Sequence, residues 1–305
     1  MTRQEIRDEI IKMVARELGD FYKVTLHEVT KNNNVRLEGL LVSRTGTNLS
    51  PTIYLENYYR NIECGCQIED AVEDIIRIVK SDKHPKNIDV KNCFSFQKQK
   101  DNVRMKVISF SANEKGLLED VPYIPFLDLA IVFYLDLSNE MPDSTVLIKN
   151  EMLKLWGISV EELYKLAKEN SKKEEYEIRS MMDVLVDMTD CADAEELFGD
   201  LAITEDTVPM FVMSNKKKLF GAAAILNIDS LKKFANRVNS DLYIIPSSVH
   251  EVILVPASKA GIDVEDTEEY FNSMIQEVNE TQLAAEEVLS NHYYFYCKTT
   301  NKITF

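Results

Sequence analysis

Residues 240–256, with the sequence SDLYIIPSSVHEVILVP, constrain the fold more than any other stretch of the chain. Two short apolar runs, Leu242 to Ile245 and Val252 to Val255, flank a polar segment that contains Pro, Ser, His and Glu. Apolar runs of this length, bounded by turn-forming residues, are typical of buried strands. The polar segment is too short for the crossover that joins parallel strands. We therefore predict an interior antiparallel hairpin, or a sharply bent connection, with its polar turn at the rim.

The polar segment also groups Ser, His and Glu, and it supplies the candidate catalytic residues Ser247, Ser248, His250 and Glu251. A hydroxyl nucleophile needs a base within hydrogen-bond reach and an acid that orients the base. Neighbours on a strand point to opposite faces, so the acid would have to come from elsewhere, such as Asp128. The sequence contains no G-x-S-x-G motif. We therefore favour the alternative, in which the turn hydroxyls bond the backbone and the imidazole bonds a local carbonyl.

The net charge of −16 on 305 residues narrows the classes of partner. So acidic a surface repels phosphate backbones and anionic lipids, and we expect neither nucleic-acid binding nor membrane binding. The longest apolar run, Leu129 to Leu135, is far shorter than a membrane span of about 20 residues. The N-terminal residues alternate charged and apolar groups and do not resemble a signal peptide.

Five scattered cysteines indicate free thiols in a reducing cytoplasm. The only close pair is Cys64-Gly-Cys66, and no second pair stands at the spacing of zinc ligands, so we predict no metal site. The chain also lacks the glycine-rich phosphate-binding motifs, and we predict no cofactor.

The first 170 residues are predicted to form an N-terminal α+β half. Thr2 and Glu5 form a capping box for the first helix, and an Asn-rich turn joins two strand-like runs, residues 22–30 and 35–43. Leu129 to Leu135 is apolar on both faces, which is typical of a central buried strand. Asp128 comes directly before this run. It either sits at the mouth of the strand, which we favour, or is buried with a partner and a shifted pKa.

Residues 171–206 are predicted to be an acidic helical connector, with Met181, Met182, Leu185 and Met188 as its apolar stripe. Residues 207–305 form the predicted C-terminal half, with the element order ββαββαββ. Within it, Leu219 to Leu226 is read as a strand-like apolar run in which Gly221 indicates close backbone packing. The predicted class is α+β, with mainly antiparallel sheets and helices packed on one face.

Several stretches are similar to a known family. They are Pro125 to Tyr134 (PFLDLAIVFY), Asn150 to Leu153 with Trp156 to Ser159, Ser247 to Val252, and Val278 to Thr281. The chain resembles a bacterial domain-of-unknown-function family of gut-dwelling anaerobic Firmicutes. It is distantly similar to a second uncharacterised Firmicutes family through the stretch W-G-x-S-x-x-E-L…A-x-x-N. The resemblance implies a cytoplasmic bacterial protein and implies no activity or site.

Three classes of function remain open from the sequence. The one we favour is a non-enzymatic binding or assembly module for a protein partner, joined by strand addition at an exposed edge such as Tyr293 to Phe305. The alternatives are a hydrolase-type enzyme that uses a Ser/His pair in the 247–251 turn, and a small-ligand sensor with a pocket between the halves. The oligomeric state is left open.

Overall fold

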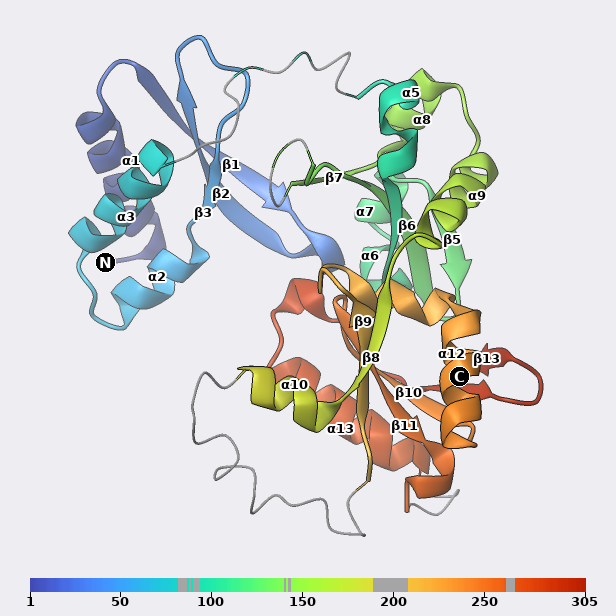
Figure 1. Cartoon of the computed structure of the whole chain (residues 1–305). Helices are drawn as coiled ribbons and strands as arrows, with labels where there is room; N and C mark the ends of the chain where they lie inside the picture. The colour runs from blue at the N-terminus through green and yellow to red at the C-terminus, as the bar shows by residue number, and fades with distance from the viewer. Residues whose placement is uncertain are drawn as a thin grey trace. The chain divides into compact units, whose positions relative to one another are not determined.

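The computed structural model describes residues 1–81, 87, 89, 94–139, 141, 144–188, 208–261 and 267–305. The chain forms two compact units, Met1–Lys100 with Leu137–Ser144, and Asp101–Asp136 with Thr145–Phe305 (Figure 1). The boundary that we predicted at residue 170 therefore falls inside the second unit. Residues 189–206 of the predicted connector lie outside the described residues.

The first unit is a three-stranded antiparallel sheet, in the order β1-β2-β3, packed against helices. Its elements are α1 (Arg3–Leu18), β1 (Tyr22–Thr30), η1 (Asn32–Asn34), β2 (Arg36–Arg44), β3 (Thr52–Tyr54), α2 (Glu56–Glu63), α3 (Ile68–Ser81) and α5 (Phe96–Gln99). The predicted Thr2/Glu5 capping box is confirmed. The apolar stripe of α1, Ile6, Ile10 and Val14, packs in one core with Val72 and Ile75 of α3.

The second unit contains two antiparallel sheets. Its elements are β4 (Val103–Ser109), α6 (Phe110–Asn113), α7 (Leu117–Asp120), β5 (Tyr123–Phe126), β6 (Leu129–Asp136), β7 (Thr145–Leu147), α8 (Asn150–Trp156), α9 (Val160–Ser171), β8 (Tyr176–Ser180), α10 (Met181–Met188), β9 (Phe211–Asn215), η3 (Gly221–Leu226), α12 (Ile228–Val238), β10 (Leu242–Ser248), β11 (Glu251–Pro256), η4 (Ala257–Lys259), α13 (Thr267–Thr281), η5 (Ala285–Glu287), β12 (Tyr294–Cys297) and β13 (Lys302–Thr304). The short η2 (Lys100–Asn102) joins the two units in sequence.

The four-stranded sheet is built around β6. This strand pairs with β4 on one side, and with β5 and β7 on the other. Every residue from Leu129 to Leu135 is buried, which confirms the predicted central strand. Helix α9 begins with a second capping box, Ser159 with Glu162, and packs against β4.

The six-stranded sheet has the order β13-β12-β10-β11-β9-β8. The predicted hairpin at 240–256 is confirmed, because β10 and β11 pair antiparallel from Leu242↔Pro256 to Ser248↔Glu251. The α+β class with antiparallel sheets is likewise confirmed. In this sheet the helices lie on both faces: α12 places Phe234 against Phe211 of β9, whereas Phe271 of α13 packs against Tyr243 of the opposite face.

Two segments differ from their predicted structure. Leu219 to Leu226 was predicted to be strand-like, but Gly221–Leu226 forms the 3₁₀ helix η3. Small alanines let this helix lie against β4, β9 and β11, so its apolar character reflects burial and not strand pairing. Tyr176–Ser180, inside the predicted helical connector, forms the strand β8. Its pairing with β9 outweighs the local helix propensity.

Candidate functional site

The turn between β10 and β11 holds the residues predicted as a catalytic pair. The Ser248 Oγ accepts a hydrogen bond from the His250 N–H at 3.0 Å. The imidazole Nδ1 accepts from the Phe220 N–H at 3.2 Å, and the His250 ring stacks on the Phe220 ring, with centroids 5.7 Å apart. The Ser248 hydroxyl thus bonds the backbone, as in the alternative that we favoured. The imidazole bonds a backbone N–H and not a carbonyl.

The other candidate residues have different neighbours. Glu251 is the ladder partner of Ser248, and the carboxylate nearest the imidazole is that of Glu287, with Oε1 3.8 Å from Nε2. Ser247 is half-buried on β10. Asp128 lies in the turn before β6, where it accepts hydrogen bonds from the hydroxyls of Ser290 and Tyr294. The catalytic role of these residues stays a prediction.

A pocket of about 620 Å³ lies in the second unit, and none of its lining residues was predicted as a site residue from the sequence. It lies between α9 and the segment that leads into β8 on one side, and η3 and the first turns of α12 on the other. The residues that line it are Met105, Tyr164, Lys168, Ser171, Lys172, Glu174, Tyr176, Ala223, Leu226, Asn227, Ile228, Asp229, Ser230 and Lys233.

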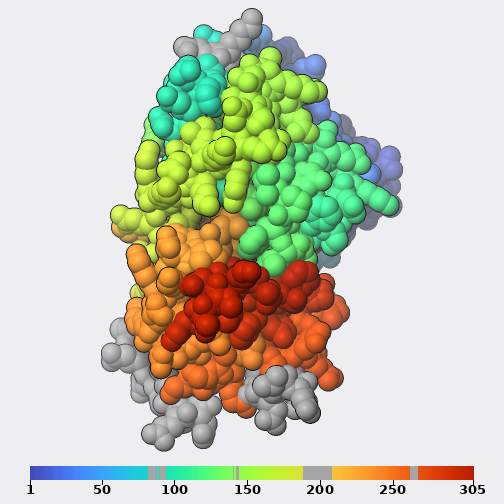
Figure 2. All heavy atoms as spheres, turned by 90° about the vertical axis from the view of Figure 1, so that its right-hand side faces the viewer, coloured from blue at the N-terminus to red at the C-terminus, as the bar shows by residue number. Residues whose placement is uncertain are grey.

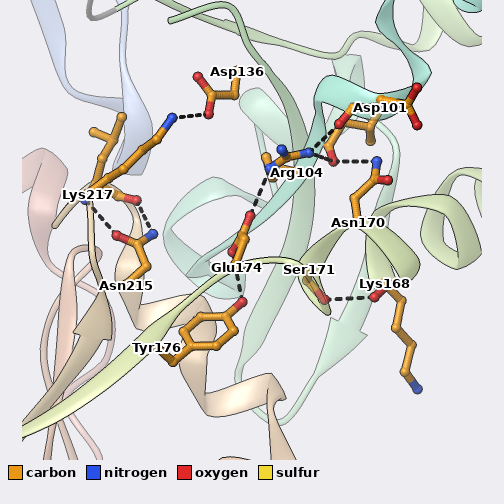
Figure 3. A network of polar contacts seen from close by, with 12 residues as sticks. Asp101, Arg104, Asp136, Lys168, Asn170, Ser171, Glu174, Tyr176, Asn215 and Lys217 are labelled. Atoms are coloured by element: carbon orange, nitrogen blue, oxygen red, sulfur yellow. Dashed lines mark hydrogen bonds and ion pairs between the residues drawn. The ribbon is translucent and has the colours of Figure 1, made fainter. Parts of the chain in front are cut away.

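Glu174 is the central polar residue of this pocket (Figure 3). Its Oε1 lies 2.9 Å from Nε of Arg104, and its Oε2 accepts a hydrogen bond of 2.9 Å from the Tyr176 hydroxyl. Burial raises the pKa of the Glu174 carboxyl, although the Tyr176 hydroxyl and the Arg104 guanidinium act in the opposite direction. Burial likewise raises the pKa of the Tyr176 hydroxyl. The polar wall of the pocket is therefore held in place by charge-assisted hydrogen bonds.

The raised pKa of Glu174 leads to a pH-dependent contribution to stability. The protonated carboxyl is favoured in the folded state, so this contribution is fully present below about pH 4.3 and is lost as pH rises through the folded pKa. Urea unfolding of the wild type and of Glu174→Gln, from about pH 4 to about pH 7, measures it. We expect the stability of the wild type relative to the variant to fall as pH rises. A relative stability that rises with pH would show that the Arg104 ion pair outweighs burial.

Three lysines give the pocket a basic rim in an acidic protein. Lys168 comes from the last turn of α9, Lys172 is the C-cap residue of that helix, and Lys233 comes from α12. The Lys172 ammonium pairs with Glu169 at 2.6 Å. Neither Lys168 nor Lys233 forms an ion pair within the described part of the chain. Asp229 is the other acid of the lining besides Glu174. The ammonium groups of Lys168 and Lys233 thus line the pocket without an ion-pair partner among the residues that the structure describes.

The strand β8 forms one edge of the six-stranded sheet. The carbonyl of Glu175 accepts from Lys216, and the N–H of Met181 donates to Met210, both on the β9 side. Because antiparallel hydrogen bonding alternates along a strand, the backbone groups of Tyr176 and Ile178 point away from β9. No described residue pairs with them on that outer side.

Hollows flank β8 on both faces of the sheet. On the α12 side, a pocket of about 250 Å³ is lined by Tyr176, Ile178, Ser230, Lys233, Phe234 and Arg237. It continues into the larger pocket, with which it shares Tyr176, Ser230 and Lys233. On the opposite face, a pocket of about 240 Å³ is lined by Glu177, Arg179, Val184, Val212, Ser214, Asn215, Lys218 and Glu251.

Three further features concern predictions made from the sequence. Cys64, Cys66 and Cys297 are free thiols, whereas Cys93 and Cys191 lie outside the described residues. Among the residues described, His, Cys, Asp and Glu side chains form no cluster suited to a metal ion. No helix in the described ranges has the length and apolar character needed to cross a membrane.

Comparison with known proteins places the chain in a family without placing it in a functional class. No curated protein matches it, and no solved structure matches it. A family model covers residues 3–298, nearly the full length, and includes all the residues of the pockets and of β8. The chain therefore belongs to the family of unknown function DUF5688.

Proposed function

We propose that this chain is a non-enzymatic binding module that accepts an extended, acidic segment of a partner protein as an additional strand on β8. The observation that carries the proposal is the outer edge of β8, with which no strand of the described residues pairs. An edge strand offers a row of backbone donors and acceptors, and a peptide in extended conformation satisfies them as it binds. Side chains of the added strand would alternate between the two faces, where the flanking hollows lie.

The edge that we predicted from the sequence, Tyr293 to Phe305, is the opposite edge of the same sheet. Its outer strand β13 has three residues, Lys302–Thr304, and two of them are exposed. Strand β8 has five residues, all half-buried, and it is flanked on both faces of the sheet by hollows that can receive side chains. It therefore offers more backbone pairing and more side-chain contact than β13.

Charge indicates the chemistry of the partner. Lys233 and Arg237 lie one turn apart on α12, facing the hollow beside Tyr176 and Ile178. Lys168 adds a third cation at the end of β8 where the larger pocket lies. The chain as a whole has a net charge of −16, which repels an acidic segment at long range, so it is this local concentration of cations that favours an acidic segment at β8.

A proline at Ile178 tests strand addition with little cost to the fold. The N–H of Ile178 points outward, so Ile178→Pro removes a donor of the edge without removing a ladder bond to β9. Ile178→Ala is the matched control, because it removes the same side chain but keeps the N–H. The probe is a fluorescent decapeptide of alternating Glu and Val, blocked at both ends, and fluorescence anisotropy measures its binding.

We expect Ile178→Pro to weaken binding of this peptide at least about tenfold relative to Ile178→Ala, and added salt to weaken binding to the wild type. Equal affinities of the Pro and Ala variants, with both still folded by circular dichroism, would contradict strand addition.

The two alternatives, a hydrolase-type enzyme and a small-ligand sensor, stay predictions. The pocket of about 620 Å³ favours a small anionic ligand as the second candidate, and binding of inorganic phosphate, measured by calorimetry, tests it.

We infer a bacterial, cytoplasmic protein from the family resemblance and from the free thiols.

A further inference from the structure

We propose that the larger pocket captures the free C-terminal carboxylate of the partner chain, so that the bound segment is the C-terminus of the partner. This inference rests on the proposed strand addition at β8 and names the part of the partner that is recognised. The pocket of about 620 Å³ and the hollow beside Ile178 form one continuous surface along β8.

The direction of the added strand follows from the position of the pocket. The pocket lies at the Tyr176 end of β8, where the strand begins, and the smaller hollow lies beside Tyr176 and Ile178. A segment that adds antiparallel to β8 runs from Ser180 toward Tyr176, and its C-terminal end reaches the pocket. A parallel segment would bring an N-terminal ammonium there. Antiparallel pairing is also slightly the more stable of the two.

The charges of the pocket suit a carboxylate and not an ammonium. Lys168 and Lys233 approach it from different helices and are unpaired within the residues described, while Lys172 stands one turn beyond Lys168. The first turn of α12 also lines the pocket, and the positive end of a helix dipole favours a negative charge.

The lining also contains two acids, Glu174 and Asp229, which weaken the preference of the pocket for a carboxylate only in part. Both oxygens of Glu174 already have partners, Arg104 and the Tyr176 hydroxyl, and burial raises its pKa. Asp229 is exposed to solvent at the start of α12, where water screens its charge. The lysines are exposed as well, and three ammonium groups against these two acids leave the lining with a net positive charge.

The volume of the pocket exceeds what a carboxylate alone fills. Met105, Leu226 and Ile228 supply apolar surface, and Tyr164 supplies an aromatic ring. This lining suits the side chain of a terminal residue of medium size, such as Val, next to its carboxylate. The segment that the surface fits is therefore an acidic C-terminus that ends in an apolar residue.

The experiment compares two forms of the Glu/Val decapeptide, both ending in Val, one with a free C-terminal carboxylate and one with a C-terminal amide. Binding is measured by fluorescence anisotropy with the full chain. The variants are Lys168→Ala and Lys233→Ala, and the matched controls are Lys165→Ala and Lys232→Ala. The control lysines are exposed residues of α9 and α12 that do not line the pocket.

We expect the free acid to bind about tenfold more tightly than the amide, since a charge-assisted hydrogen bond is replaced by a neutral one. Lys168→Ala and Lys233→Ala should reduce this ratio toward one, and the two control variants should leave it unchanged. Equal affinities for acid and amide would overturn capture of the carboxylate. So would a ratio that persists when Lys168 and Lys233 are both replaced.

Failure of this inference is distinguishable from failure of strand addition. If acid and amide bind equally but Ile178→Pro weakens both, strand addition stands and capture of a C-terminal carboxylate is wrong. If Ile178→Pro leaves the binding of both peptides unchanged, or if neither peptide binds, strand addition is wrong and capture of the carboxylate falls with it.

Discussion

Gly221→Ala is expected to lower the free energy of unfolding of the second unit by about 3 kcal/mol, the upper end of the usual cost of overpacking. A Cβ at this position would lie 2.5 Å from the carbonyl oxygen of His250 and 2.7 Å from the backbone nitrogen of Asn215, and would overlap the Ser214 Oγ. Two of these three atoms are backbone atoms of β9 and of the β10–β11 turn, so rotation of a side chain does not relieve the clash. Urea unfolding followed by circular dichroism measures the loss.

Gly39→Ala is the matched control for Gly221→Ala. Its Cβ would also meet a neighbour, the Thr52 methyl at 2.6 Å, and a Val29 methyl at 3.3 Å. Both are the ends of side chains, which can shift, so we expect a loss of about 1 kcal/mol or less in the first unit. Equal losses of free energy of unfolding for the two variants would contradict this expectation. They would show that β9 and the β10–β11 turn can move apart to make room for a Cβ at Gly221.

Asp128→Ala is expected to cost about 3 kcal/mol, because it removes the acceptor that two buried hydroxyls share and leaves Ser290 only a longer bond of 3.4 Å to the His292 carbonyl. Ser290 donates to Oδ2 at 2.6 Å and Tyr294 donates to Oδ1 at 2.7 Å, and the Tyr294 side chain is completely buried. These bonds join the β5–β6 turn of one sheet to β12 and the segment before it. Figure 2 shows the C-terminal segment, in red, lying against the green residues that include this part of the chain. Chemical denaturation monitored by Tyr fluorescence provides the measurement.

Tyr294→Phe separates the hydrogen bonds from the packing. This change removes one donor together with its need for an acceptor, so we expect a loss of about 1 kcal/mol. Addition of Tyr294→Phe to Asp128→Ala should then cost less than it does alone, since the orphaned hydroxyl is gone. Full additivity of the two losses would contradict the assignment of Asp128 as the acceptor for Tyr294.

The elements that the sequence predicted correctly are those whose signals are local. The capping box at Thr2 and the hairpin at 240–256 depend on residues a few positions apart. The buried run from Leu129 to Leu135 is apolar on both faces and admits few other structures. Asp128 illustrates the limit of such signals, because its partners Ser290 and Tyr294 stand more than a hundred residues away in the chain.

The elements that were not predicted correctly depend on distant partners. Strand β8 belongs to an acidic stretch of sequence that by itself favours helix, and it forms a strand because β9, far along the chain, pairs with it. The pocket combines β4, α9, η3 and α12, so no local motif marks it. The sequence held one weak signal of this surface. Lys168 and Lys172 are spaced by one helical turn near the end of α9, and Tyr176 and Ile178 are spaced by two residues, which places both side chains on the same face of β8.

Amide hydrogen exchange at Ile178, followed by NMR, tests the central claim most directly. In the free protein we expect this amide to exchange quickly, and the amides of Glu177 and Arg179, which face β9, to be protected. Saturation with the acidic peptide that ends in a free carboxylate should slow exchange at Ile178 and leave its two neighbours unchanged. An Ile178 amide that is already protected in the free protein, or one that exchanges as fast with bound peptide as without it, would contradict the account.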